Sequence, residues 1–128
     1  MDLATLLAQS DFVSLHVPMT ESTAKMINAE SIAKMKDGAV LINCARGGVV
    51  DSEALAAALN SGKLSAAGID VFENEPPLAV EHPLLHAKNI VVTPHVAFAS
   101  KEDLEARADI VFANIDAFLA GKPQNLVK

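Results

Sequence analysis

Apolar and polar positions are grouped along this chain in blocks that predict strands separated by helices. Short runs rich in Val, Ile, Leu and Phe, bounded by Gly, Pro or polar residues, are typical of strands. Longer blocks with apolar residues three or four positions apart are typical of amphipathic helices. The expected strands span residues 12–17, 39–43, 66–71 and 90–92. The expected helices span residues 2–8 and 28–35, a stretch between Asp51 and Gly62, and about 100–121, with a helical turn near Leu84 and Leu85.

The strand pattern indicates a parallel sheet. Residues 39–43 form an unbroken apolar run that ends in Asn43, which favours burial on both faces. Strands that alternate with helical crossovers favour parallel pairing with right-handed connections. We therefore predict an α/β fold: a three-layer parallel sheet of about four strands with flanking helices, flavodoxin-like in outline. The length of 128 residues suits a single domain, residues 1–128.

Composition and charge exclude several classes of protein. Hydrophobic residues make up 51% of the chain and aromatic residues 4%, so the core must be aliphatic. The net charge of −6 and the scattered basic residues argue against a nucleic-acid partner. Cys44 is the single cysteine, which excludes an intrachain disulfide and a cysteine-rich zinc site and fits a cytoplasmic setting. No apolar run reaches the roughly 18 residues of a membrane span, so we expect no membrane partner.

Three polar stretches each follow a predicted strand: residues 43–48, 68–77 and 93–95. The carboxyl ends of parallel strands open into one crevice, where ligands bind. This arrangement would bring an arginine, acidic residues and a histidine together. The sequence therefore predicts a chemical site at this end of the sheet.

The residue types in these stretches suit acid–base chemistry on a carboxylate ligand. Arg46 offers a planar fork that matches a carboxylate, and the glycines behind it allow close approach of the backbone. His95 is the usual kind of side chain for proton transfer near neutral pH, and a carboxylate such as Glu75 would favour its protonated form. Each residue also has a structural interpretation: Arg46 could pair with a surface acid, Asp70 could cap a turn, and Glu75 could be solvated.

Four other polar residues have structural interpretations. We expect Glu73 to be solvent-exposed and the three remaining histidines to be structural, with no metal site: His16, His82 and His86.

Taken together, these motifs resemble those of the NAD-dependent D-2-hydroxyacid dehydrogenases, the family that includes phosphoglycerate, glycerate and D-lactate dehydrogenases. The resemblance implies that Arg46 holds the substrate carboxylate, that His95 exchanges a proton with the substrate oxygen, and that Glu75 keeps His95 protonated. The matching stretches are Leu15-His16-Val17-Pro18-Met19-Thr20, Asn43-Cys44-Ala45-Arg46-Gly47-Gly48-Val49-Val50-Asp51, Gly68-Ile69-Asp70-Val71-Phe72-Glu73-Asn74-Glu75-Pro76 and Thr93-Pro94-His95-Val96-Ala97-Phe98.

The same resemblance implies a nicotinamide cofactor, NAD, with NADP left open. Asp70 would face the nicotinamide carboxamide. A small 2-hydroxy or 2-oxo acid would be the substrate. The remaining residues that would line the cofactor are Val17, Pro18, Thr23, Cys44, Ala45, Arg46 and His95.

The chain contains no Gly-x-Gly-x-x-Gly turn, which cradles the pyrophosphate in the first half of a dinucleotide-binding domain. It therefore resembles the second half of such a domain, a half-Rossmann fragment with a closing helix. We expect weak NAD binding and little activity from the chain alone, and a homodimer formed through the edge strand 12–17 or the closing helix. Two alternatives are a non-catalytic half-domain that folds and self-associates, and a nucleotide-sensing binding protein.

Overall fold

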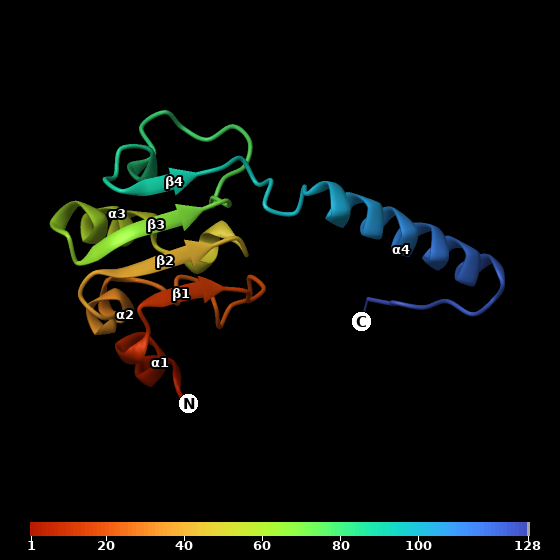
Figure 1. Cartoon of the computed structure of the whole chain (residues 1–128), viewed down its shortest axis with the longest axis horizontal. Helices are drawn as coiled ribbons and strands as arrows, with labels where there is room; N and C mark the ends of the chain where they lie inside the picture. Colours follow the sequence, from red (N-terminus) through yellow and green to blue (C-terminus); the bar gives the residue numbers. More distant parts are fainter. Residues whose placement is uncertain (128) are drawn as a thin grey trace. The chain divides into compact units, whose positions relative to one another are not determined.

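A computed structural model describes residues 1–127, and its elements follow the predicted order (Figure 1). The first compact unit is Met1–His95, and the second begins at Val96. The strands are β1 (Phe12–Leu15), β2 (Ala39–Asn43), β3 (Leu64–Ile69) and β4 (Ile90–Val92). The helices are α1 (Leu3–Gln9), α2 (Ala29–Lys34), α3 (Ser52–Ser61) and α4 (Lys101–Leu119), with 3-10 turns η1 (Gly47–Val49) and η2 (Pro83–Leu85).

The four strands form one parallel sheet in the order β1-β2-β3-β4. The register aligns Val13 with Leu41, Leu41 with Ala67, and Ala67 with Ile90. All four strands therefore end on the same side of the molecule, where the arrowheads point in Figure 1. The predicted fold class, a parallel α/β sheet of four strands with flanking helices, is confirmed.

One face of the sheet is buried under helices. Val13 and Leu41 of the sheet belong to the same buried cluster as Ile32 of α2 and Leu55 and Leu59 of α3. The helices begin at capping side chains: Asn28 accepts hydrogen bonds from the first turn of α2, and Asp51 accepts one from the backbone N–H of Ala54 in α3. This aliphatic core fixes the strands whose ends carry the polar stretches.

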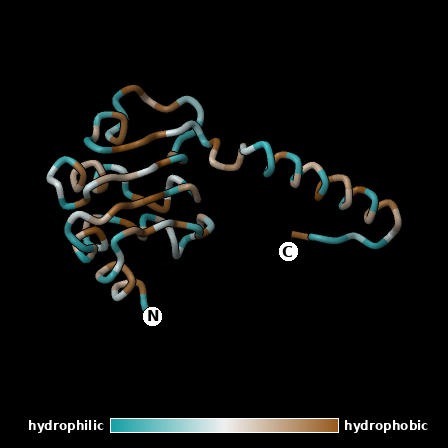
Figure 2. Tube along the Cα trace, in the orientation of Figure 1, coloured by the Kyte–Doolittle hydropathy of each residue, from teal (hydrophilic) through white to brown (hydrophobic). Residues whose placement is uncertain are grey.

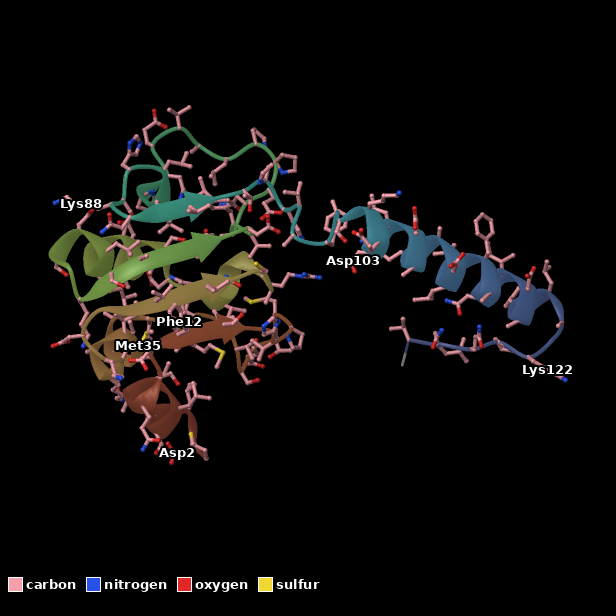
Figure 3. All side chains as sticks on the ribbon, in the orientation of Figure 1. Asp2, Phe12, Met35, Lys88, Asp103 and Lys122 are labelled. Atoms are coloured by element: carbon pink, nitrogen blue, oxygen red, sulfur yellow. The ribbon has the colours of Figure 1, made fainter. Side chains whose placement is uncertain are left out.

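The other face of the sheet is open within Met1–His95. Phe12, which is labelled in Figure 3, is 71% exposed on β1, and Val91 is 68% exposed on β4. Between them, Val40 and Ile42 of β2 are half-buried. Of the three expected layers, residues 1–95 therefore form two, the sheet and one layer of helices.

The second unit is dominated by α4, a helix where the sequence predicts one over about 100–121. Ser100 caps its first turn by accepting a hydrogen bond from the N–H of Asp103. Figure 2 shows hydrophobic and hydrophilic residues interspersed along this helix, and none of its residues is buried. The guanidinium of Arg107 lies 4.7 Å from the ring centre of Phe98. Among residues 1–127, no helix combines the length and the apolar character that crossing a membrane requires.

Two strand boundaries differ from the prediction. β1 ends at Leu15 instead of residue 17, because its partner strand β2 ends opposite it at Asn43. β3 runs over Leu64–Ile69 instead of residues 66–71, because Leu64 pairs with Ala39 across an irregular register. The turn η1 has no signal in the hydrophobic pattern. The backbone N–H of Val49 donates to the carbonyl of Arg46, and the N–H of Val50, the residue after η1, donates to the carbonyl of Gly47.

Candidate active site

The polar stretches predicted to meet do lie at one end of the sheet. Arg46 follows β2, Asp70 follows β3, and His95 follows β4, while Val17 and Pro18 follow β1. Because the four strands are parallel and adjacent, these residues share the carboxyl edge of the sheet (Figure 1). All of them belong to the unit Met1–His95.

His95 and Glu75 form a direct side-chain pair. The Nδ1 atom of His95 lies 2.7 Å from Oε2 of Glu75, and the two side chains are 41% and 28% exposed. The other carboxylate oxygen of Glu75 accepts a hydrogen bond from the backbone N–H of Phe72. The pair borders an open cavity of about 280 Å³ lined by Phe72, Glu75, Pro76, Leu78, Pro94 and His95. A histidine and a carboxylate in contact at the wall of a cavity can bind and transfer a proton.

The environment of Glu75 favours its ionised form. Burial raises the pKa of the Glu75 carboxyl. The Phe72 N–H and the His95 imidazole lower it by more than burial raises it, so the net pKa lies below 4.5. Asp70 raises this pKa slightly through charge repulsion. Glu75 therefore stays negative beside the imidazole at neutral pH.

His95 has an unusual backbone conformation, with φ at +56°. Residues other than glycine seldom adopt this left-handed region, and they do so mainly where the surrounding structure requires it. The chain turns at His95 directly after Thr93 and Pro94, at the end of β4.

Asp70 links the ends of three strands. It is 3% exposed, and its backbone N–H donates to the carbonyl of Asn43 at 3.0 Å. The hydroxyl of Thr93 donates to Oδ1 of Asp70. Asp70 therefore holds the ends of β2 and β4 beside its own strand.

Arg46 borders a second hollow, next to β1. Its Nη1 donates to the carbonyl of Ala45 at 2.6 Å, and Asn43 shapes this turn. The Oδ1 atom of Asn43 accepts from the N–H of Ala45, and its Nδ2 donates to the carbonyl of Arg46. The hollow has a volume of about 360 Å³ and is lined by His16, Val17, Pro18, Cys44, Ala45 and Arg46.

Gly47, the residue after Arg46, makes a close backbone contact with Phe72, which lines the His95–Glu75 cavity. A Cβ atom on Gly47 would lie 2.0 Å from the carbonyl carbon of Phe72. The turn that carries Arg46 thus packs directly on the loop that carries Glu75. Arg46 is not among the residues that line the His95–Glu75 cavity.

Thr23 occupies a different position from the other predicted cofactor residues. Its hydroxyl donates to the carbonyl of Pro18 at 2.7 Å and accepts from the N–H of Thr20 at 2.8 Å. Thr23 is not among the residues lining either hollow. Its hydroxyl stabilises the loop after β1.

Sequence analysis assigned no role to Asn43 or Thr93, although both lie at strand ends inside the motifs. A polar residue at the end of an apolar run is the signal that could have found them.

His16 borders the Arg46 hollow, and its Nε2 lies 2.8 Å from the hydroxyl of Ser14. His86 contacts the carbonyl of Val80 at 2.8 Å. Among residues 1–127, no group of three or more His, Cys, Asp or Glu residues is arranged to hold a metal ion.

Comparison with curated proteins identifies close relatives. Glycerate dehydrogenase from Methylorubrum extorquens is 50% identical over 132 residues, which cover 100% of this chain and 41% of the relative. Hydroxypyruvate reductase from Thermotoga maritima is 55% identical over 103 residues, which cover 80% of this chain and 34% of the relative. The chain thus spans about two fifths or less of the length of these relatives.

Solved structures of similar fold include a dehydrogenase and a reductase. D-lactate dehydrogenase from Aquifex aeolicus, complexed with NAD and lactic acid, has a TM-score of 0.82 and 39% identity; the match covers 95% of this chain and 41% of that one. An acyclic imino acid reductase in complex with NADPH and D-Arg has a TM-score of 0.91 and 32% identity; the match covers 100% of this chain and 40% of that one. The family model described as "D-isomer specific 2-hydroxyacid dehydrogenase, NAD binding domain" matches residues 1–97. This chain therefore belongs to the D-isomer specific 2-hydroxyacid dehydrogenase family.

Proposed function

We propose that this chain supplies the proton-transferring side of the active site in an NAD(P)-dependent enzyme that interconverts a small D-2-hydroxy acid and its 2-oxo acid. The observation that carries the proposal is the His95–Glu75 pair, held at 2.7 Å at the same sheet edge as Arg46. Membership of the family supports this assignment.

In this proposal His95 is the general acid and base. During reduction it gives a proton to the carbonyl oxygen of the 2-oxo acid, and during oxidation it takes the proton from the hydroxyl group. Glu75 is bonded to Nδ1, so Nε2 is the nitrogen that exchanges the proton. The negative charge of Glu75 stabilises the imidazolium form that reduction consumes and oxidation generates.

Arg46 is the proposed anchor for the carboxylate of the substrate. Its guanidinium can donate two parallel hydrogen bonds to a carboxylate and can also polarise the neighbouring carbonyl group. The exposed position of Arg46 beside a hollow of about 360 Å³ supports this role.

The strand-end residues fit a nicotinamide cofactor. Val17, Cys44 and Ala45 give the Arg46 hollow small side chains, and the buried carboxylate of Asp70 lies at the adjacent strand end. Residues proposed to hold the cofactor are Val17, Pro18, Thr23, Cys44, Ala45, Arg46, Asp70 and His95. When bound, NAD(P) supplies or accepts the hydride.

The named activities of the relatives indicate the substrate class. They include glycerate dehydrogenase, hydroxypyruvate reductase and glyoxylate reductase, at 45–50% identity over at least 98% of this chain. We accordingly propose a short 2-oxo acid of this type, with two or three carbons, as the substrate.

A chimaera tests this function. Residues 1–128 would replace the matching segment of glycerate dehydrogenase from Methylorubrum extorquens, which is 50% identical. The purified chimaera would be mixed with NADH or NADPH and a panel of 2-oxo acids that includes glyoxylate, hydroxypyruvate and pyruvate. We expect oxidation of the cofactor with at least one of them. A folded chimaera that oxidises neither cofactor with any of these acids would refute the proposal.

The polypeptide of residues 1–128 should be nearly inactive by itself and should self-associate. Its sequence has no Gly-x-Gly-x-x-Gly turn to bind the pyrophosphate, so the cofactor would be held at its nicotinamide end alone. Its edge strand β1 and the apolar residues of α4 are exposed, which supports association into a homodimer.

A further inference from the structure

Glu73 lies two residues before the proposed catalytic Glu75, and its carboxylate bridges two other elements. Its Oε1 accepts a hydrogen bond of 2.5 Å from the hydroxyl of Ser52, the first residue of α3. Its Oε2 lies 3.2 Å from Nε2 of His82, which precedes η2. We call these three residues the Glu73 anchor. Glu73 is exposed, as the sequence predicts, and both of its carboxylate oxygens have partners.

Two members of the Glu73 anchor, Ser52 and His82, are largely shielded from solvent, whereas Glu73 is an exposed residue. Ser52 is 8% exposed, and the side chains of His82 and Glu73 are 14% and 30% exposed. The backbone N–H of Leu84 points to Nδ1 of His82 at 3.4 Å, which favours the tautomer with the proton on Nε2. His82 then donates this proton to Glu73.

The anchor is connected to the active site through Phe72. The ring of Phe72 meets the ring of His82 edge-on, with centres 5.4 Å apart and planes at 88°. The backbone N–H of the same Phe72 donates to Glu75, which binds His95. The backbone of Phe72 also packs on Gly47. Phe72 is therefore fixed on one side by Gly47 and on the other by His82, next to the anchored Glu73.

We propose that Glu73 is a positioning residue, which uses Ser52 and His82 to hold the Phe72 amide and thereby the Glu75–His95 pair. The inference rests on the proposed function for its importance in catalysis. The effect of Glu73 on the Phe72 amide and on Glu75 can be measured in the 128-residue chain without substrate or cofactor. A failure of the positioning proposal is therefore distinguishable from a failure of the proposed function.

The test compares Glu73→Gln and Ser52→Ala with two matched controls. Glu81→Gln removes a carboxylate from the same loop, at an exposed residue for which the structure gives no hydrogen bond among residues 1–127. Ser61→Ala removes a hydroxyl at the other end of α3, where it bonds to the carbonyl of Ala58 in the same helix. Amide spectra would first establish that each variant is folded.

Two measurements report on the positioning itself. Hydrogen exchange of the Phe72 amide should accelerate roughly fivefold in each test variant, as expected for the loss of one hydrogen bond. The pH midpoint of the Glu75 carboxyl carbon, followed by NMR, should rise, because the Phe72 N–H and His95 that lower the Glu75 pKa are held less firmly.

The outcomes separate positioning from general loosening of the fold. Changes in both test variants, with both controls unchanged, support the proposal. The double variant should then add little to either single one, because both variants weaken the same Ser52–Glu73–His82 bridge. Unchanged Phe72 exchange and an unchanged Glu75 midpoint overturn the proposal, as do equal changes in the controls. If one test variant does not fold, the other and His82→Gln decide by the same criteria.

Discussion

The carboxylate of Glu75 shows how single residues give this site its chemistry. One oxygen accepts a hydrogen bond from the backbone N–H of Phe72, and the other contacts His95, so the negative charge is held in place and stabilised. The folded chain therefore binds a proton at Glu75 less readily than the unfolded chain, and the pair contributes stability that depends on pH.

This linkage predicts a pH dependence for the effect of Glu75→Gln. The folded-state pKa of Glu75 is lowered from 4.5, so its stabilisation is complete above that pH and is lost as the pH falls through the lower folded value. The variant should therefore lose more unfolding free energy at pH 7 than at pH 3, as measured by urea denaturation. Glu81→Gln serves as the control. A gap between wild type and Glu75→Gln that is equal at both pH values would contradict the prediction.

The contact between Gly47 and Phe72 predicts that a larger residue at position 47 destabilises the fold. Its Cβ would lie 2.0 Å from the carbonyl carbon of Phe72 and 2.3 Å from the oxygen, so backbone must shift. We expect Gly47→Ala to lower the unfolding free energy by about 1–3 kcal/mol or more. Gly68→Ala is the matched control, because its Cβ would meet a side-chain atom of Ile42 at an ordinary 4.0 Å. Equal stability of the two variants would show that the turn can move away.

Helix α3 is capped by Asp51, the residue before its first turn, whose carboxylate has two functions. It accepts a hydrogen bond from the N–H of Ala54 and pairs with Nζ of Lys25 at 2.9 Å. Lys25 lowers the pKa of Asp51, with the backbone bond of Ala54 acting in the same direction. The N-terminus of α3 is therefore tied to the loop that follows β1.

Removing this cap should destabilise the fold measurably. Asp51→Ala should lower the unfolding free energy by about 1 kcal/mol, because it leaves the N–H of Ala54 without its side-chain partner. Asp51→Asn keeps the cap and loses the charge pair with an exposed lysine, so its effect should be smaller. Thermal and urea unfolding of both variants would measure the difference. A loss in Asp51→Asn as large as that in Asp51→Ala would assign the effect to the charge pair with Lys25.

Sequence patterns predict the elements of this fold well because each apolar run matches a buried face. Strand β2 has the predicted bounds, residues 39–43. Asp51 caps the start of α3 and Gly62 caps its end, as expected. The ends of β1 and β3 were displaced because pairing with β2 sets where a ladder ends, and hydropathy does not encode the partner.

The candidate site was predictable only in part. Parallel topology places Arg46, Asp70, Glu75 and His95 at one edge, and the His95–Glu75 contact agrees with the expectation. Sequence reasoning could not separate the Arg46 hollow from the His95–Glu75 cavity, because their separation depends on the packing of the intervening turn. It also missed the partners of Glu73, which come from residues 21 positions before it and 9 positions after it.

On the scale of the whole molecule, the chain exposes apolar surface in both of its units. Phe12 on the edge strand β1 is 71% exposed, and Phe118 on α4 is 70% exposed. Exposed edge strands and apolar helix faces are covered by other protein surfaces in most folds. This surface is the basis for the proposed homodimer.

Light scattering across a range of concentrations tests that association. We expect the mass of a dimer for the 128-residue polypeptide and a shift towards monomer for Phe12→Glu, which places a charge on the edge strand. Val80→Glu changes an equally exposed loop residue and should leave the mass unchanged. A monomer at every concentration would contradict the self-association proposal. A dimer unaffected by Phe12→Glu would move the interface away from β1.

In the proposed function, His95, paired with Glu75, transfers the proton of the reaction. The most direct measurement is kcat for NAD(P)H-dependent reduction of the preferred 2-oxo acid by the chimaera and its His95→Gln variant. We predict a loss of roughly 10²–10⁴-fold for His95→Gln with the affinity for the cofactor retained. His86→Gln, at an exposed histidine outside the site, should keep full activity. A His95→Gln variant with undiminished kcat would contradict the assignment of His95 as the general acid and base.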